Sequence, residues 1–182
     1  MDEGLRSPLL DHDPGEPPVF RPGNLLEAAR RRKRLPRMKA LRDEGTSYHY
    51  LPAGRFSIAS PSLMAVVARR MAEAEIPVHR GTSWTTDAPF RETESLIASR
   101  RKEGIVSVEM EAAALLAMGI AIGKPVICLA HVTNAMATRG EDFEKGGGAG
   151  LEESLTVCTL ALSAALEHAG TKINRREGGR HE

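Results

Sequence analysis

The chain has 182 residues, of which 41% are hydrophobic and 27% charged, as in an ordinary globular protein. This length suits one domain with a substantial core. The formal net charge is +1, so no overall field draws the chain towards nucleic acid or an anionic membrane surface. Aromatic residues make up only 4%, so the core must be built mainly from aliphatic side chains.

The composition of the termini and the cysteines favours a cytoplasmic protein. The N-terminus is acidic and proline-rich, unlike a secretory signal. The longest apolar stretch, Ala112 to Ile122, is too short to span a membrane. Cys128 and Cys158 stand alone without metal-type spacing, and we expect both to be reduced.

Three regions are predicted along the chain. Residues 1–37 form an irregular lead-in with one short basic helix, residues 38–170 form an α/β domain, and residues 171–182 form a flexible tail. The basic run from Arg30 to Arg34 raises the alternative of a nucleic-acid site. Without aromatic neighbours, it is better explained as a solvated helix end.

The first half of the domain alternates between strand and helix. A strand end and a loop are expected over residues 38–52, because this segment lacks a helical period. Ser60 and Pro61 then predict the start of a helix that continues to Ile76. The following stretch, residues 77–90, is β-prone and ends in a polar loop.

The second half continues the alternation. Thr93 is expected to begin a polar helix, and a short strand over residues 105–108 leads into an apolar helix that starts near Glu109. Residues 126–132 form a continuous apolar run, typical of a strand that is buried on both faces. The last amphipathic helix is predicted over residues 151–168.

This order predicts an α/β fold of three layers, α/β/α, with a mostly parallel or mixed central sheet. Ligands of such sheets bind beyond the carboxyl ends of the strands. Residues 85–91, 108–111 and 131–136 fall at those ends. We therefore expect the functional site at this edge.

Two glutamates flank Met110 at the start of the apolar helix. If the helix has already begun at Glu109, side chains two residues apart point in different directions, so Glu109 and Glu111 are not an acid–base dyad. One interpretation is structural, because acids in a first helical turn stabilise the helix dipole. The other is functional: one carboxylate accepts from two adjacent sugar hydroxyls, with methionine as an apolar wall.

Other chemistry is not indicated. The six histidines form no spaced cluster, so a metal site is not expected. His131 follows an apolar run and is either a polar group at the pocket or a satisfied core residue. The stretch from Lys145 to Gly150, "KGGGAG", lacks the order of a phosphate loop and favours a connector.

Four segments occur in this order: "LRDEGTSYHYLP", "PVHRGTSWTTDAPF", "VEMEAAALLAMG" and "VICLAHVTN". Together they resemble the nucleoside phosphorylase family, its uridine phosphorylase branch most of all, over about residues 41–169. The resemblance implies that the protein converts a nucleoside and inorganic phosphate into a base and ribose 1-phosphate. Phosphate would be the co-substrate, with no metal or organic cofactor.

The resemblance also implies roles for individual residues. Glu111 would bind the ribose hydroxyls, Met110 would pack against the sugar, and Glu109 would support the loop. Phe90 would lie against the base, with Arg91 next to it in the substrate loop.

Asn134 falls where purine-specific relatives carry an aspartic acid, which protonates the purine ring as the glycosidic bond breaks. An amide cannot act as that acid. Asn134 would therefore contact the base by hydrogen bonding, which favours pyrimidine nucleosides such as uridine. Other purine phosphorylases do use an asparagine against the base.

The sequence departs from the family at the phosphate site. The Gly-Asp-Pro-x-Arg-like turn, the Gly-rich phosphate loop, and the further Arg and Thr contacts are not found. We therefore expect a domain without its N-terminal phosphate-binding part, whose activity is weak or lost. The alternatives are a non-catalytic nucleoside-binding or oligomerisation module, and a nucleosidase that uses water. Four arginines remain without an assigned phosphate role: Arg42, Arg55, Arg80 and Arg91.

The expected partner is a nucleoside, with no nucleic acid and no membrane. Loss of interior strands would expose sheet edges and apolar helix faces. Such surfaces favour either self-association, and thus a homo-oligomer, or an unstable chain.

Overall fold

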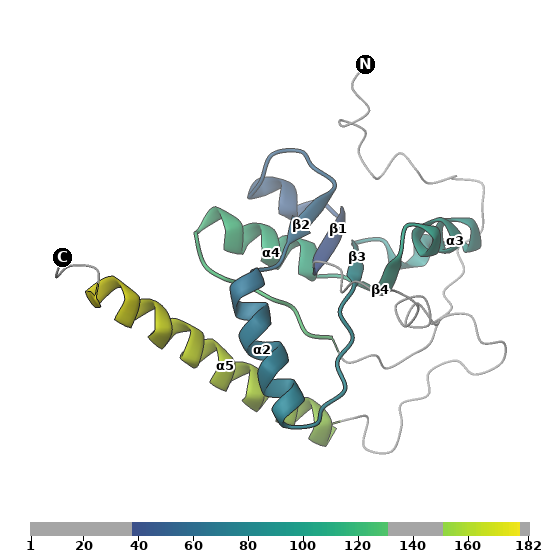
Figure 1. Ribbon diagram of the computed structural model, residues 1–182. Coiled ribbons are helices and arrows are strands. Elements are labelled where there is room, and N and C mark those ends of the chain that lie inside the picture. The colour runs from purple at the N-terminus through teal and green to yellow at the C-terminus, as the bar shows by residue number, and fades with distance from the viewer. Residues whose placement is uncertain (1–37, 131–150, 179–182) are drawn as a thin grey trace.

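The computed structural model describes residues 38–130 and 151–178. Its centre is a four-stranded sheet of order β2-β1-β3-β4 (Figure 1). β1, β3 and β4 run parallel, whereas β2 is antiparallel to β1. This mixed α/β architecture confirms the predicted fold class. The strands are β1 (Lys39–Asp43), β2 (Phe56–Ile58), β3 (Thr82–Thr86) and β4 (Ile105–Glu109).

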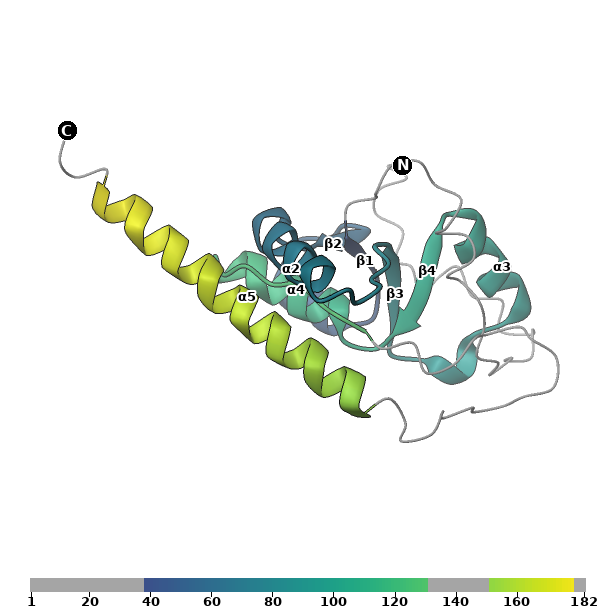
Figure 2. The same ribbon diagram turned by 60° about the horizontal axis from the view of Figure 1, so that its bottom comes forward.

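Helices cover both faces of the sheet, because successive strand residues point to opposite sides. On one face Leu41 packs with Leu96 of α3. On the other face Ala40 packs with Leu116 of α4. α2 and α5 pack against each other on the α4 side, so the molecule has three layers (Figures 1 and 2). The helices of the described residues are α2 (Pro61–Glu73), α3 (Glu94–Lys102), α4 (Ala112–Ala121) and α5 (Leu151–Gly178), with 3-10 turns η3 (Thr46–His49) and η4 (Pro89–Arg91).

Two helix starts follow from local capping chemistry. Ser60 is the N-cap of α2, and its side chain accepts from the backbone N–H of Leu63, with Pro61 in the first turn. Thr93 caps α3 in the same way by accepting from the N–H of Leu96. Both predicted helix starts are confirmed. They could be predicted because each capping side chain and the N–H group that it binds lie within one turn.

Three predicted helix boundaries need correction. α4 begins at Ala112, because Glu109 is still the last residue of β4. α2 ends at Glu73, three residues before the expected end. α5 passes the predicted end at His168 and continues to Gly178.

The predicted strand over residues 126–132 is wrong for its described part. Residues 126–130 form no strand, although Val126 accepts a backbone hydrogen bond from the N–H of Ser60. Val126, Ile127 and Cys128 pack as partly buried side chains against the cluster that includes Leu116. Residues 126–128 are therefore partly buried by this cluster rather than paired in the sheet, whereas Leu129 and Ala130 are exposed.

Some predictions lie outside the described residues. These are the short basic helix within residues 1–37, His131, Asn134 and the glycine-rich run at residues 145–150. Among the helices that the structure describes, none has the length and apolar character needed to cross a membrane. The same ranges hold no group of three or more His, Cys, Asp or Glu residues arranged for a metal ion.

Candidate functional site

The start of α4 is held by side chains from the ends of β3 and β4. The Glu109 Oε2 atom accepts from the backbone N–H groups of Glu111, at 2.9 Å, and Ala112, at 2.6 Å. The Thr85 hydroxyl donates to Glu109 Oε1 at 2.6 Å and accepts from the N–H of Ala113 at 2.9 Å. Glu109 and Thr85 thus satisfy N–H groups that a helix start leaves open.

Thr85 lies in the segment 85–91 that was expected at this edge, but the sequence analysis gave it no role of its own. Thr85 and Glu109 are direct partners in the parallel register of β3 and β4. Thr85 is fully buried, which fits a hydroxyl that has both donor and acceptor partners. Its position at the carboxyl end of a β-prone run was the available signal.

Glu111 is used differently from Glu109. It is exposed, and its Oε2 atom accepts from the N–H of Met110 at 3.3 Å. No other hydrogen bond joins its carboxylate to residues 38–130 or 151–178. The Met110 side chain is also exposed, at 49%. Among the described residues, most of the capacity of Glu111 to accept hydrogen bonds is therefore unused.

A cavity of about 380 Å³ opens beside the two glutamates. Both line it, together with Ser83 and Ser107 from the sheet and Leu115 from α4. Glu109 and Glu111 were expected to point in different directions if the helix had already begun at Glu109. α4 begins at Ala112, after both glutamates, so this expectation does not apply. Hydroxyls and carboxylates between apolar walls, in a volume of this size, are typical of a small-molecule site.

Cys128 lines the same cavity from the extended segment after α4. Burial raises the pKa of its thiol to about 11, and the charges of Glu109 and Glu111 also raise it. The thiol is therefore protonated at neutral pH and is a poor nucleophile.

The loops after β1, β3 and β4 meet at one edge of the sheet. The Asp87 carboxylate, after β3, accepts from the backbone N–H of Gly45, after β1, at 3.1 Å. Phe90 of η4 is 72% exposed, and Arg91 is half-buried. Phe90, Arg91 and Met110 belong to the loops at this edge but are not among the residues that line the cavity.

Two of the four arginines that were left without an assigned phosphate role form contacts within the protein. Arg42 is buried, donates to the Ser47 hydroxyl and the Pro52 carbonyl at 2.8 Å each, and lies over the Tyr48 ring. Arg55 forms an ion pair with Glu103. Neither guanidinium lines the cavity beside the glutamates.

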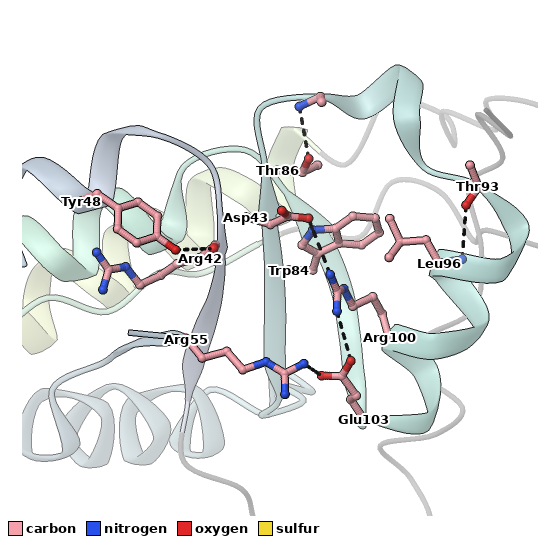
Figure 3. Close-up of polar contacts among 11 residues, drawn as sticks. Arg42, Asp43, Tyr48, Arg55, Trp84, Thr86, Thr93, Leu96, Arg100 and Glu103 are labelled. Carbon is pink, nitrogen blue, oxygen red and sulfur yellow. Dashed lines mark hydrogen bonds and ion pairs between the residues drawn. The ribbon is translucent and has the colours of Figure 1, made fainter. Parts of the chain in front are cut away.

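A second polar cluster lies on the α3 face of the sheet (Figure 3). The Trp84 indole N–H donates to Asp43 Oδ2 at 2.8 Å. A guanidinium nitrogen of Arg100 lies 3.8 Å from the same oxygen, and another lies 3.1 Å from Glu103. Asp43, Trp84 and Arg100 are all buried, so this cluster supports the fold.

Comparison with known protein families identifies the superfamily of this chain. The family model of the Phosphorylase superfamily matches residues 27–169, which is most of the chain. The chain belongs to this superfamily. The resemblance of the four sequence segments is thereby confirmed at the level of the family. A search of curated proteins gives no match.

Two solved structures are similar to parts of this chain. AMP nucleosidase from Bacteroides thetaiotaomicron VPI-5482 is similar with a TM-score of 0.52 and 25% identity, over 72% of this chain and 52% of that one. The P. knowlesi homologue of P. falciparum PNP is similar with a TM-score of 0.45 and 23% identity, over 57% and 44% respectively. The chain thus spans about half the length of these structures.

Proposed function

We propose that this chain binds the ribose of a nucleoside at the start of α4 and serves in cleavage of the N-glycosidic bond. The observation that carries the proposal is the difference between two neighbouring carboxylates. Glu109 is occupied by Thr85 and by the first N–H groups of the helix, whereas Glu111 faces the cavity with acceptor capacity to spare. Each hydrogen bond from a sugar hydroxyl to such a carboxylate contributes about 1.5–3 kcal/mol.

The other site residues have supporting roles in this proposal. Glu109 is a positioning residue, because it fixes the backbone from which Glu111 projects. Met110 supplies an exposed apolar surface to the sugar, and Phe90 supplies an exposed ring to the base. Asn134 donates or accepts a hydrogen bond at the base.

The reaction we propose is phosphorolysis of a pyrimidine nucleoside such as uridine. The bond from C1′ to the base breaks with its electron pair leaving on the base, and a phosphate oxygen forms the new bond to C1′. Glu111 holds the ribose diol while positive charge develops on the sugar. Inorganic phosphate is the co-substrate, and no metal or organic cofactor takes part. The proposal includes nucleoside salvage in the cytoplasm by a homo-oligomer.

Hydrolysis is the second candidate, and one structural observation favours it. Arg42 and Arg55 are engaged within the protein, so these two cations are not free to hold phosphate. The similar structure from Bacteroides is an AMP nucleosidase. Binding of a nucleoside without turnover is the remaining alternative. Because the chain spans about half of that structure, catalysis by the chain alone is part of what must be tested.

Calorimetric titration with uridine and with 2′-deoxyuridine tests the ribose contact. We expect Glu111→Gln to weaken uridine binding by about tenfold or more, since 1.4 kcal/mol is a factor of ten. The parent should discriminate against 2′-deoxyuridine, and Glu111→Gln should lose this discrimination. Glu153→Gln, an exposed glutamate on α5, is the matched control. Equal uridine affinity in Glu111→Gln and the parent would refute the proposal.

Release of uracil with and without phosphate separates the reactions. Phosphate-dependent release supports phosphorolysis, and release that is independent of phosphate supports the nucleosidase. Binding without release supports the non-catalytic alternative.

A further inference from the structure

Two serines line the sheet side of the cavity beside Glu111. Ser83 of β3 and Ser107 of β4 are direct partners in the parallel register of these strands, and both are half-buried. Each lies two residues before a member of the Thr85–Glu109 pair and therefore on the same face of the sheet. At about 3.3 Å per residue, the serines are about 7 Å further from the loops at the carboxyl ends of the strands.

The two serine hydroxyls have unused hydrogen-bonding capacity. Neither makes a hydrogen bond within residues 38–130 and 151–178, whereas the Thr85 hydroxyl both donates and accepts. Neighbouring strands lie about 4.8 Å apart, so one ligand atom between the serines can be at hydrogen-bond distance from both hydroxyls. A serine hydroxyl can donate or accept. The pair therefore suits a ligand group that also does both, such as an alcohol.

The charge at the cavity disfavours an anionic ligand group beside the serines. The two glutamates line the cavity, and burial together with their charges raises the pKa of the Cys128 thiol in the same lining. Lys39 also lines the cavity, but its Nζ atom lies 3.5 Å from the centroid of the Phe56 ring, which packs on the α3 face. His79 is exposed to solvent. A phosphate group near the glutamates would meet like charge, whereas a neutral alcohol would not.

The expected position of the base gives the ribose a direction. Under the proposed function Glu111 holds the 2′ and 3′ hydroxyls, and the base lies against Phe90. Phe90 is in η4, after the carboxyl end of β3, and is not among the residues that line the cavity. C1′ and C4′ flank the ring oxygen of the sugar. A base held at the loops therefore turns the 5′ carbon away from them, towards the serines.

We propose that Ser83 and Ser107 form a subsite for the neutral 5′-hydroxymethyl group of the nucleoside. The pair distinguishes this group from a 5′-deoxy sugar by hydrogen bonding, and the charge of the two glutamates disfavours a 5′-phosphate. The subsite rests on the ribose contact proposed for Glu111. The serines lie away from the bond that breaks, so they determine specificity and take no part in the chemical step.

Calorimetric titration with uridine, 5′-deoxyuridine and uridine 5′-phosphate tests the subsite. The parent should bind 5′-deoxyuridine about tenfold more weakly than uridine, because this ligand leaves both serine hydroxyls without a partner. It should bind uridine 5′-phosphate at least about tenfold more weakly, with a smaller difference at high salt. The double change Ser83→Ala and Ser107→Ala should weaken uridine binding about tenfold and leave the affinity for 5′-deoxyuridine unchanged.

Two controls separate recognition from a structural effect. Ser99→Ala, at an exposed serine of α3, is the matched control and should bind all ligands as the parent does. The double variant should keep its preference for uridine over 2′-deoxyuridine, because Glu111 is unchanged. A structural effect would weaken all the nucleosides alike. The comparison of ligands on the parent needs no substitution, so it decides even where a variant fails to fold.

The outcomes distinguish this subsite from the proposed function. Equal affinity of the parent for uridine and 5′-deoxyuridine, or unchanged discrimination between them in the double variant, overturns the subsite and leaves the ribose contact intact. Binding of uridine 5′-phosphate that is as tight as that of uridine overturns the preference for a neutral group. Loss of discrimination at the 2′ position alone overturns the ribose contact at Glu111. A parent that binds no nucleoside overturns both proposals.

Discussion

The two faces of the sheet treat their charged side chains differently. On the α3 face, Asp43 and Arg100 are buried and are joined to Trp84 by a hydrogen bond and close contacts. On the α4 face, Glu111 is exposed at a cavity and has a single backbone contact among the described residues. Asp43 and Arg100 support the fold and have partners within the protein. Glu111, which we propose serves a ligand, keeps acceptor capacity unused among the described residues.

Removal of Trp84 should give the largest loss of stability. Trp84→Ala leaves a cavity at a residue that is 1% exposed and removes the indole donor from Asp43. We expect a loss of about 3–5 kcal/mol, measured by urea unfolding followed by far-UV circular dichroism. Trp84→Phe keeps most of the packing and should lose less. A loss below about 1 kcal/mol for the alanine variant would contradict the role assigned to the α3 face.

Glu92 is an exception to this comparison, because it is buried but one of its carboxylate oxygens has no partner among the described residues. It lies between η4 and α3, is 3% exposed, and its Oε2 atom has no hydrogen-bond partner among the described residues. Burial raises the pKa of its carboxyl to about 7. The folded state therefore holds this proton more tightly than the unfolded state. The free energy of unfolding should fall as the pH rises from about 4.5 to about 7, and then stay level.

Glu92→Gln should remove this pH dependence. Above pH 7 the variant should be more stable than the parent by up to about 3 kcal/mol, because the cost of ionising a buried carboxyl disappears. Urea unfolding at several pH values measures the effect. Glu94→Gln, an exposed neighbour, is the control and should follow the parent. A parent whose stability does not fall across this window would contradict the argument.

Glu109→Ala should cost less than the loss of Trp84. It leaves the N–H groups of Glu111 and Ala112 without their carboxylate acceptor, and it frees the Thr85 hydroxyl. Loss of such a helix cap typically costs about 0.5–2 kcal/mol. We expect thermal unfolding to show this loss, with weakened uridine binding because the backbone at Glu111 is no longer fixed. Unchanged stability would show that the helix start does not depend on this carboxylate.

Glu111→Ala should have the smallest effect on stability. Changes at exposed residues away from structural features are usually within about 0.5 kcal/mol. The same substitution should nevertheless remove ribose recognition in calorimetry. A large loss of stability would instead place Glu111 with Glu109 as a residue that supports the fold.

Local signals in the sequence predicted the fold well where both partners of an interaction are close in the chain. Ser60 and Thr93 cap helices through N–H groups three residues away, so the pattern contains the whole interaction. The alternation of strands and helices likewise predicted the layers, because each element must cover its own apolar face.

Interactions between distant residues were not predictable in the same way. The start of α4 depends on Thr85 from β3, so Glu109 and Glu111 could not be separated by their own segment. The apolar run at residues 126–130 has the composition of a buried strand, yet only residues 126–128 pack against the cluster that includes Leu116, and Leu129 is 41% exposed. Composition indicates that side chains are buried but does not specify which element buries them.

Gly119 limits the width of the cavity, although it is not one of the residues that line it. A Cβ atom at this position of α4 would lie 2.5 Å from Val126 Cγ2 and 3.0 Å from the carbonyl oxygen of Lys124. Any side chain there must push Val126 away from the helix, and the backbone of residues 128–130 continues from Val126 along the cavity wall. The width of the cavity is therefore coupled to one helical position that no ligand in it would touch. Exchange at residue 119 offers a means to change ligand size while every contacting side chain stays the same.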